Sequence, residues 1–446
     1  MGAKGRLVPD ISEMIADMTP KGELVFDIFG GTGAVSQSLV SDYTVYANDV
    51  QHYSSVVLGA TVEHGPRSSA RLRSLLDFEK DIRPGFDKHK SQLLKVFKGP
   101  ISEERRGLSE AMEGRLDVYR NFVRDTPIYP CVEKDLTKLW RGAARYLTEK
   151  AFAEGALKKG EGPHHLMTSY YQGVYFGLEQ AIELDALRVA ISEIEGHYAA
   201  RKRRHYLAAL LCAASVSTSG TSHFAQPRNL KLDRELKAVA KRRVSSISGV
   251  MKSYSKGIKE YLAKTKFQNG NKVYKSDYRS LLSRVRRRPS TIYADPPYTA
   301  DNYSRFYHVL EVLARYDYPP LLRRRDGQLS KGRYPSREYR FQSGFCAAPK
   351  VEDEFRRLAR CSSRLGSSLV VSYALPTGLL FKRFIPGCGT EKRALQRFLG
   401  LFRERYKRVS LVQRSLMHSG QGDSNHQVTE LLVRCRLPRK AAGCGI

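Results

Sequence analysis

The chain has 446 residues and 41% of them are hydrophobic, so it is long enough to bury a large core. It carries 76 Lys and Arg against 45 Asp and Glu, which gives a formal net charge of +31. Such an excess destabilises a compact state through self-repulsion and is typical of proteins that bind a polyanion. Nucleic acid is the leading candidate, and a merely basic enzyme is the alternative.

Several classes of protein do not fit this composition. No apolar run approaches the roughly 18 residues that a membrane-spanning helix needs, and the N-terminal sequence shows no apolar core of a signal peptide. The seven cysteines are scattered and form no CxxC pair, so a structural zinc site is not expected. The sequence therefore predicts a reduced, cytoplasmic protein that does not enter a membrane.

The N-terminal part is predicted to fold as a strand, a tight turn, a helix and a second strand. The apolar run at 23–29 predicts a buried strand, and the GGTG turn at 30–33 follows it. A helix is expected over 34–40, and the next strand, at 43–49, ends in an acid. This order is typical of the beginning of an α/β sheet.

The turn and the acid suit a nucleotide-like ligand. Gly31 and Gly33 allow the backbone to turn sharply after a strand and to approach a ligand closely. Asp49 ends the next strand 18 residues after Gly31, a spacing that suits a carboxylate accepting hydrogen bonds from ribose hydroxyls. The alternative is an ordinary tight turn followed by a surface acid.

The region 63–288 is mostly helical by pattern and heavily charged. Apolar residues recur at helical spacing over 177–194, and a buried helix is predicted over 206–216. Basic clusters and interleaved tyrosines suit a surface that faces phosphates, although any one cluster is equally consistent with a solvated helix face. The clusters lie at 201–205, 241–243 and 284–288, and the tyrosines are Tyr170, Tyr171, Tyr175, Tyr198 and Tyr206.

The histidines do not have the spacing of a metal site. No carboxylate or Cys partner lies at ligand spacing from them, so they are expected to have loop or packing roles and no metal is predicted. These residues are His164, His165, His223 and His308.

The α/β pattern returns near residue 290. Strands are expected at 291–294, 367–375, 408–414 and 427–435, with a helix over 351–365. The simplest organisation is one α/β catalytic domain interrupted by a large, mainly helical insertion. The predicted parts are 1–62, which carries the glycine turn, 63–288, the insertion and target-recognition region, and 289–446, the rest of the catalytic domain.

The strand at 291–294 ends in Asp295, Pro296, Pro297 and Tyr298. Because prolines cannot continue a central strand, they end it at its carboxyl edge, where open α/β sheets place ligands. The amino nitrogen of adenine is a poor nucleophile, since its lone pair is delocalised into the ring. Acceptors on both of its N–H bonds, such as the Asp295 carboxylate and the Pro296 carbonyl, favour a reactive tetrahedral geometry. Tyr298 offers a face for stacking on a base, and the alternative is a proline-rich turn that caps a strand.

Together these motifs resemble those of S-adenosylmethionine-dependent, adenine-specific DNA methyltransferases. Phe29, Gly31 and Gly33 match an FxGxG cofactor motif, and Asp295–Tyr298 match the catalytic DPPY motif. The order of cofactor motif, long insertion and tetrapeptide is similar to that of the alpha group, the Dam-like branch. MGAKGRL at 1–7 resembles the N-terminal cofactor motif of that group, with Lys4 as its lysine.

The resemblance implies a Rossmann-like, seven-stranded methyltransferase sheet, S-adenosylmethionine as cofactor, and a target adenine flipped out of the duplex. It implies no metal and no covalent enzyme intermediate. The implied cofactor residues are Asp27, Phe29, Gly31 and Gly33 around the pocket, Asp49 on the ribose and Lys4 near the methionine carboxylate. The implied catalytic residues are Asp295, Pro296, Pro297 and Tyr298.

The sequence thus predicts a site-specific methyltransferase acting on the amino group of adenine in double-stranded DNA. The expected setting is restriction–modification or phage defence, with any cognate restriction endonuclease encoded separately. One alternative is adenine methylation of RNA, and another is an inactive DNA-binding scaffold that keeps the fold. Methylation of the cytosine amino group is less favoured, because that chemistry more often carries serine in place of Asp295.

Overall fold

The computed structural model describes residues 3–127, 129, 131, 136–143, 147, 164–220, 223–300, 303–419 and 425–437. The chain separates into two compact units, which are described one at a time. Unit 1 comprises 1–70, 264–304 and 341–446, and unit 2 comprises 71–263 and 305–340.

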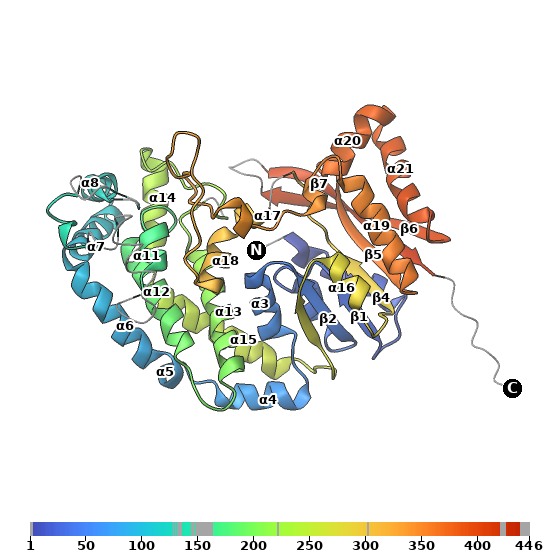
Figure 1. The fold of residues 1–446 in the computed structure, drawn as a ribbon, viewed down its shortest axis with the longest axis horizontal. Helices are drawn as coiled ribbons and strands as arrows, with labels where there is room; N and C mark the ends of the chain where they lie inside the picture. Colours follow the sequence, from blue (N-terminus) through green and yellow to red (C-terminus); the bar gives the residue numbers. More distant parts are fainter. Residues whose placement is uncertain are drawn as a thin grey trace. The chain divides into compact units, whose positions relative to one another are not determined.

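Unit 1 is built on a seven-stranded mixed sheet with the strand order β3-β2-β1-β4-β5-β7-β6 (Figure 1). The first five strands in this order are parallel, whereas β7 runs antiparallel to both β5 and β6. The strands are β1 (Leu24–Asp27), β2 (Thr44–Asp49), β3 (Lys272–Lys275), β4 (Thr291–Ala294), β5 (Ser368–Leu375), β6 (Arg408–Ser419) and β7 (Asn425–Arg436). The predicted Rossmann-like α/β class is confirmed.

Every strand predicted from the sequence is present, but β3 was missed. The two central strands β1 and β4 are buried along their whole length, as expected for parallel strands covered on both faces. Strand β3 begins and ends in exposed lysines and lies at the edge of the sheet. Charged edge strands resist pairing with other chains, and for the same reason they show no apolar run in the sequence.

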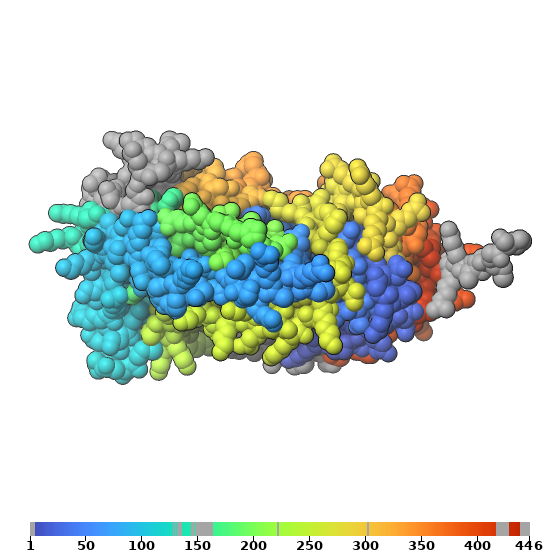
Figure 2. All heavy atoms as spheres, turned by 90° about the horizontal axis from the view of Figure 1, so that it is seen from below, coloured from blue at the N-terminus to red at the C-terminus, as the bar shows by residue number. Residues whose placement is uncertain are grey.

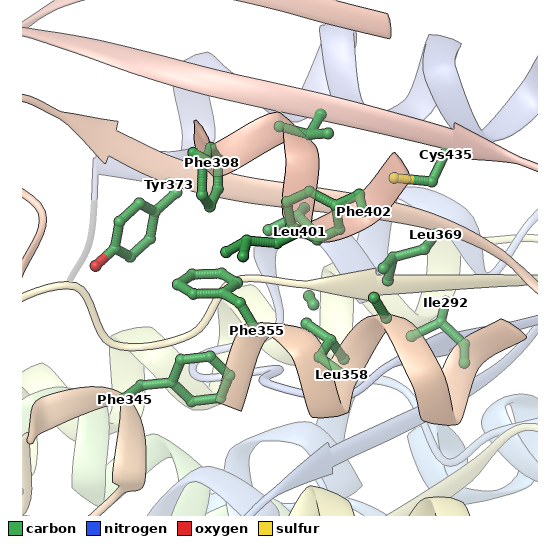
Figure 3. Close-up of a cluster of buried hydrophobic side chains, with 14 of the residues drawn as sticks. Ile292, Phe345, Phe355, Leu358, Leu369, Tyr373, Phe398, Leu401, Phe402 and Cys435 are labelled. Atoms are coloured by element: carbon green, nitrogen blue, oxygen red, sulfur yellow. The ribbon is translucent and has the colours of Figure 1, made fainter. Parts of the chain in front are cut away.

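One face of the sheet is covered by four helices around a large aromatic core. Figure 3 shows Ile292 and Leu369 of the central strands facing Phe355 and Phe402, which come from two of these helices. The helices are α16 (Tyr278–Arg284), α19 (Val351–Arg364), α20 (Leu379–Cys388) and α21 (Glu391–Arg403), with the short η5 (Gly344–Cys346) beside α19. The helix predicted over 351–365 is therefore confirmed.

A second group of helices, from the N-terminal part of unit 1, packs on the sheet. Helix α1 contacts β5, and helices α2 and α3 contact β2. Their bounds are α1 (Val8–Ala16), α2 (Ala34–Leu39) and α3 (His52–Thr61), and η1 (Ala3–Arg6) precedes them. The predicted strand–turn–helix–strand order at the N-terminus is thus confirmed.

Unit 2 is helical. Its described elements are α5 (Phe78–Asp81), α6 (Arg83–Val96), α7 (Lys98–Met112), α8 (Asp117–Asp125), η3 (Arg141–Ala143), α11 (Leu166–Tyr171), α12 (Leu178–Ser192), α13 (Ala199–Ser217), α14 (Asp233–Arg243), α18 (His308–Arg315) and η4 (Arg337–Tyr339). Helices α4 (Pro66–Leu75), α15 (Ile247–Lys264) and α17 (Tyr303–Phe306) cross the limits between the units. Among the helices that the structure describes, none combines the length and apolar character needed to cross a membrane.

The centre of unit 2 is the almost fully buried helix α12, which contacts α6, α7, α11 and α13. Its N-terminus is capped by Glu104, whose two carboxylate oxygens accept hydrogen bonds from the amides of Leu178 (2.8 Å) and Glu179 (2.9 Å). Figure 2 shows the light-blue segment of α5 and α6 beside the green beginning of α13. Asp81 joins these segments by accepting a hydrogen bond from Lys202 Nζ at 2.7 Å.

The segment 305–340, which follows the tetrapeptide, packs with unit 2 rather than with the sheet. After α18 it forms a ribbon over 320–336, drawn in orange in Figure 1, with antiparallel bridges that join Leu321 to Pro335 and Arg323 to Leu329. The domain limits 1–62, 63–288 and 289–446 remain a prediction, and the compact units differ from them at this ribbon and at β3.

Candidate active site

The two motifs singled out in the sequence lie at one edge of the sheet in unit 1. β1 and β4 are neighbours, but the chain continues from β1 to β2 on one side and from β4 to β5 on the other. The amide of Ile28 donates to the carbonyl of Tyr293 at 3.1 Å, so both segments leave the sheet side by side. Open α/β sheets bind ligands at such a switch point, at the carboxyl ends of their strands.

The glycine turn has the backbone conformation that requires glycine. Gly31 and Gly33 have φ values of 52° and 87°, in the left-handed region. A Cβ on Gly31 would meet no atom within 4 Å, whereas one on Gly33 would lie 3.0 Å from side-chain atoms of Gln37 and Leu58. Gly31 therefore faces open space, and Gly33 allows the turn to pack on the helices behind it.

Asp49 closes the turn from the end of β2. Its two oxygens accept hydrogen bonds from the amides of Gly31 (3.0 Å) and Gln51 (2.9 Å), and the residue is half-buried. A carboxylate oxygen has more than one lone pair, so these bonds leave room for further donors. The structure therefore brings Gly31 and Asp49, both singled out in the sequence, into direct contact.

Sequence reasoning missed Asn48, which holds three strand ends together. Its buried side-chain amide donates to the carbonyls of Ile28 (3.1 Å) and Ser276 (3.0 Å), and its Oδ1 accepts from the amide of Ser276 at 3.1 Å. The only signal in the sequence was a second polar residue beside Asp49 at the end of an apolar strand.

Asp27 is a buried carboxyl at the end of β1, with only 1% of its surface exposed. Ser36 donates to its Oδ2 at 2.6 Å, while Oδ1 is buried without a hydrogen-bond partner in the described part of the chain. The pKa of Asp27 is raised to about 7, mainly by burial and to a smaller extent by the nearby charges of Asp295 and Asp49, while the hydrogen bond from Ser36 opposes the rise. Three carboxyl groups are thus close enough to interact at this edge of the sheet.

The tetrapeptide starts at the end of β4. Asp295 and Tyr298 are half-buried and Pro296 is buried. The carbonyl of Tyr298 accepts a hydrogen bond from the amide of Leu379 at 2.7 Å, and its ring lies edge-on to Tyr373, with centroids 6.3 Å apart. These contacts hold the backbone and the ring of Tyr298 in a defined orientation.

Phe29 forms part of an aromatic wall beside the glycine turn. Its ring lies 5.3 Å from Tyr278 and 5.6 Å from Phe345, centroid to centroid. Tyr278 is fixed in turn by a hydrogen bond from its hydroxyl to Glu354. Tyr278 and Phe345 were not predicted, because they are far from Phe29 in the sequence.

A row of buried polar groups continues behind the tetrapeptide. Tyr293 is buried, and burial together with the charges of Asp295, Asp27 and Glu430 raises the pKa of its phenol. Ser372 donates to Glu430 Oε1 at 2.6 Å, and both are buried.

Lys4 belongs to η1, but its side chain lies outside the described residues.

The tyrosines of unit 2 correct a prediction. Tyr170, Tyr171, Tyr175 and Tyr206 are buried with at most 3% of their surface exposed, so they do not face phosphates. Tyr175 holds the ribbon 320–336 by donating to the carbonyl of Gly332 (3.2 Å), and Tyr170 holds the residue just before it by donating to the carbonyl of Pro319 (3.1 Å). The apolar bodies of these rings are the reason for their burial.

The basic clusters divide into internal and exposed groups. In the cluster 241–243, Arg243 is buried against Tyr119 and Ser219, so the phosphate-facing prediction was wrong for it. His308 is likewise internal, with its ring nitrogens 2.8 Å from two backbone carbonyl oxygens. By contrast, all four arginines of the cluster 284–288 are exposed.

The tip of the ribbon carries exposed charge. Gly327 has φ 77°, and its amide donates to the carbonyl of Arg324 at 3.0 Å, which closes the tip with the turn residues expected of a hairpin. Arg324 pairs with Asp326 at 3.0 Å. Arg325 and Lys331 are exposed and form no ion pair within the described residues.

Comparison with known proteins finds a family with a similar sequence. Residues 1–123 and 235–331 match the family model of the D12 class N6 adenine-specific DNA methyltransferases. The chain is similar to this family over these two segments, which together make up just under half of its length. The matched residues include both the glycine turn and the tetrapeptide of the methyltransferase sheet.

Named relatives are similar over a larger part of the chain. Modification methylase LlaI of Lactococcus lactis subsp. lactis is 26% identical over 368 residues, which cover 81% of this chain and 44% of that protein. Type II methyltransferase M.FokI of Planomicrobium okeanokoites is 24% identical over 339 residues, 72% of this chain and 37% of that protein. Type II methyltransferase M.NlaIII of Neisseria lactamica is 26% identical over 201 residues, 44% of this chain and 51% of that protein. The chain thus spans less than half the length of the first two relatives.

Proposed function

We propose that this chain transfers a methyl group from S-adenosylmethionine to the exocyclic amino group of adenine in duplex DNA. The observation that carries the proposal is the meeting of the glycine turn and the Asp295–Tyr298 tetrapeptide at the switch point between β1 and β4, in a chain similar to an adenine-specific DNA methyltransferase family. The glycine turn offers groups that suit the adenosyl part of the cofactor, and the tetrapeptide offers groups that suit the target adenine.

The residues at the glycine turn fit the cofactor. The open space above Gly31 lets a ligand approach the backbone, and the half-buried Asp49 carboxylate offers acceptors for ribose hydroxyls. Phe29 and Asp27 would line the cofactor pocket, and Lys4 would bind the methionine carboxylate. When bound, S-adenosylmethionine supplies a methyl group activated by a positively charged sulfur.

The tetrapeptide would bind the target base. The Asp295 carboxylate and the Pro296 carbonyl would accept hydrogen bonds from the two N–H groups of adenine, which increases electron density on the amino nitrogen. Pro296 and Pro297 restrict the backbone, so the acceptors lose little entropy on binding. Tyr298, held against Tyr373, would stack on a base flipped out of the duplex.

Unit 2 would supply much of the DNA contact. Two-stranded ribbons fit the major groove of B-form DNA, and the ribbon 320–336 places Arg325 and Lys331 at an exposed position. Contacts to phosphates release counterions, so affinity for DNA should fall steeply with salt. We propose that this ribbon contacts the duplex. As a separate contact, the exposed arginines of the cluster 284–288 in unit 1 would bind phosphates.

The proposed setting is restriction–modification in the cytoplasm. The relative LlaI is named a modification methylase, and this name supports a restriction–modification setting. The partner endonuclease would be encoded separately. Adenine methylation of RNA and an inactive scaffold remain the two rival functions.

The test is modification-sensitive sequencing of DNA from cells that express the chain, beside an Asp295→Ala variant as the matched inactive control. A methylated adenine in one short sequence motif, absent with the variant, is the expected result. The purified variant should still bind S-adenosylmethionine, which separates a chemical defect from misfolding. Unmodified DNA from cells with folded wild-type protein would overturn the proposal and direct the search to RNA.

A further inference from the structure

The carboxyl groups at the switch point form an unusual electrostatic environment. Asp27 is almost completely buried, and its Oδ1 has no hydrogen-bond partner in the described part of the chain. The charges that act on it most strongly belong to Asp295, beyond the end of β4, and Asp49, at the end of β2. Buried carboxylates that are not fully hydrogen-bonded are costly unless a cation joins them.

Among the residues that the structure describes, the other groups around Asp27 do not supply that cation. Ser36, from α2, is a hydroxyl donor at 2.6 Å, and the backbone amide of Phe29 also favours the ionised form. Tyr293 lies on β4, and the charges of Asp27, Asp295 and Glu430 contribute to the raised pKa of its phenol. A positively charged ligand would therefore change the protonation of this carboxyl.

We infer that Asp27 is a specificity-determining residue that favours the positively charged cofactor over its neutral product. The inference rests on the proposed function. S-adenosylmethionine carries a sulfonium, whereas S-adenosylhomocysteine carries an uncharged thioether, and the two share the same amino and carboxylate groups. Below pH 7, Asp27 holds a proton in the ligand-free protein. When the cation binds, the carboxyl loses that proton to solvent and becomes a carboxylate. After transfer the extra positive charge is gone, the carboxyl takes up a proton again, and the product is held less tightly.

This coupling has a measurable consequence. Because the pKa of Asp27 is about 7 without ligand, binding of the cation must expel a proton at pH 6 but almost none at pH 8. The preference for the cation over the neutral product should therefore fall by about tenfold between pH 8 and pH 6. The amino group common to both ligands cancels in the ratio of their affinities.

The experiment is calorimetric titration of the full chain with sinefungin, which has an ammonium in place of the methylated sulfonium, and with S-adenosylhomocysteine. Each titration is done at pH 6 and pH 8 in two buffers with different ionisation enthalpies, which counts the protons released. The wild type should release close to one proton more for sinefungin than for S-adenosylhomocysteine at pH 6. This readout does not depend on turnover.

Two variants and a control make the result specific. Asp27→Asn is nearly isosteric and should make the affinity ratio independent of pH, with equal proton release for both ligands. Ser36→Ala removes the donor to Oδ2 and should move the pH midpoint upward, which keeps the test valid if Asp27→Asn does not fold. Asp353→Asn removes an exposed carboxyl from α19 in the same unit and should leave the pH dependence unchanged.

The outcomes are distinct. A pH-independent ratio in the wild type, or an unchanged pH dependence in Asp27→Asn, would overturn the role of Asp27 while leaving DNA methylation intact. A chain that binds neither ligand would overturn both this role and the cofactor assignment. Methylated adenine found by sequencing together with a flat ratio would refute only the inference about Asp27.

Discussion

Glu104 holds the N-terminus of the central helix of unit 2, so its replacement should destabilise that unit strongly. Its side chain accepts hydrogen bonds from the amides of Leu178 and Glu179 and lies near the buried Arg243. Leu178 is 1% exposed, so water does not replace the lost acceptor. Hydrogen bonds to a charged group contribute about 1.5–3 kcal/mol each, and Glu104→Ala should cost about 3–5 kcal/mol.

The assay is thermal unfolding followed by the fluorescence of Trp140. This residue is the single tryptophan of the chain and packs in the same cluster as Leu178, so its signal reports unit 2. A loss of this size should lower the midpoint by about 10 °C in a unit of roughly 200 residues. Glu103→Ala is the matched control, because it removes the neighbouring carboxylate, whose one ion-pair partner among the described residues is Arg106 on the surface. That change should cost less than about 1 kcal/mol.

Glu104→Gln provides a graded intermediate. Its amide has one oxygen to accept a hydrogen bond and an NH₂ group that opposes the second backbone donor. Its midpoint should lie between those of the wild type and Glu104→Ala. If Glu104→Ala and Glu103→Ala gave equal midpoints, the helix-cap reasoning would be refuted.

Three further predictions concern the sheet and the ribbon. Asp27 has a folded pKa of about 7, above its unfolded value, so its contribution to stability is complete at low pH and is lost as the pH rises through 7. The free energy of unfolding of Asp27→Asn, relative to that of the wild type, should therefore rise by about 3 kcal/mol between pH 5 and pH 8. Hydrogen exchange of the β1 peptide measures this difference, and a difference that stays constant with pH would contradict the raised pKa. Gly33→Ala should cost unit 1 about 2 kcal/mol, because φ is 87° and the new Cβ lies 3.0 Å from two side chains; unchanged hydrogen exchange of the same peptide would show that the turn relaxes freely. Replacing Arg325 and Lys331 together by Ala should lower the slope of log affinity for duplex DNA against log salt concentration by about 2, and Arg360→Ala on α19 should not; equal slopes would exclude the ribbon as a DNA contact.

The sequence by itself determined the elements that have a local physical signature. Apolar runs ending in turn residues located β1, β2 and β4, since parallel strands are buried on both faces. Gly31 was predictable because a sharp turn after a strand requires a positive φ, which was found. The tetrapeptide at Asp295 was predictable because prolines end strands.

Only the tertiary structure decided which groups meet and which are buried. The strand β3 escaped prediction because its exposed lysines reflect its place at the edge of the sheet, a property set by distant segments. Asn48 and Ser276 bond across 228 positions of sequence, and Glu104 caps a helix that begins 74 residues later. No local pattern reports such pairs.

The same limit applies to charge and burial. A tyrosine in a basic region has the same local pattern whether it faces phosphates or an apolar core, and Tyr171 proved to be buried. The sequence places an acid at the end of β1, but the pKa of Asp27 depends first on its burial in the folded chain and then on the carboxyl groups that β2 and β4 bring beside it. Electrostatic environment is a sum over neighbours in space, so it appears only when the chain has folded.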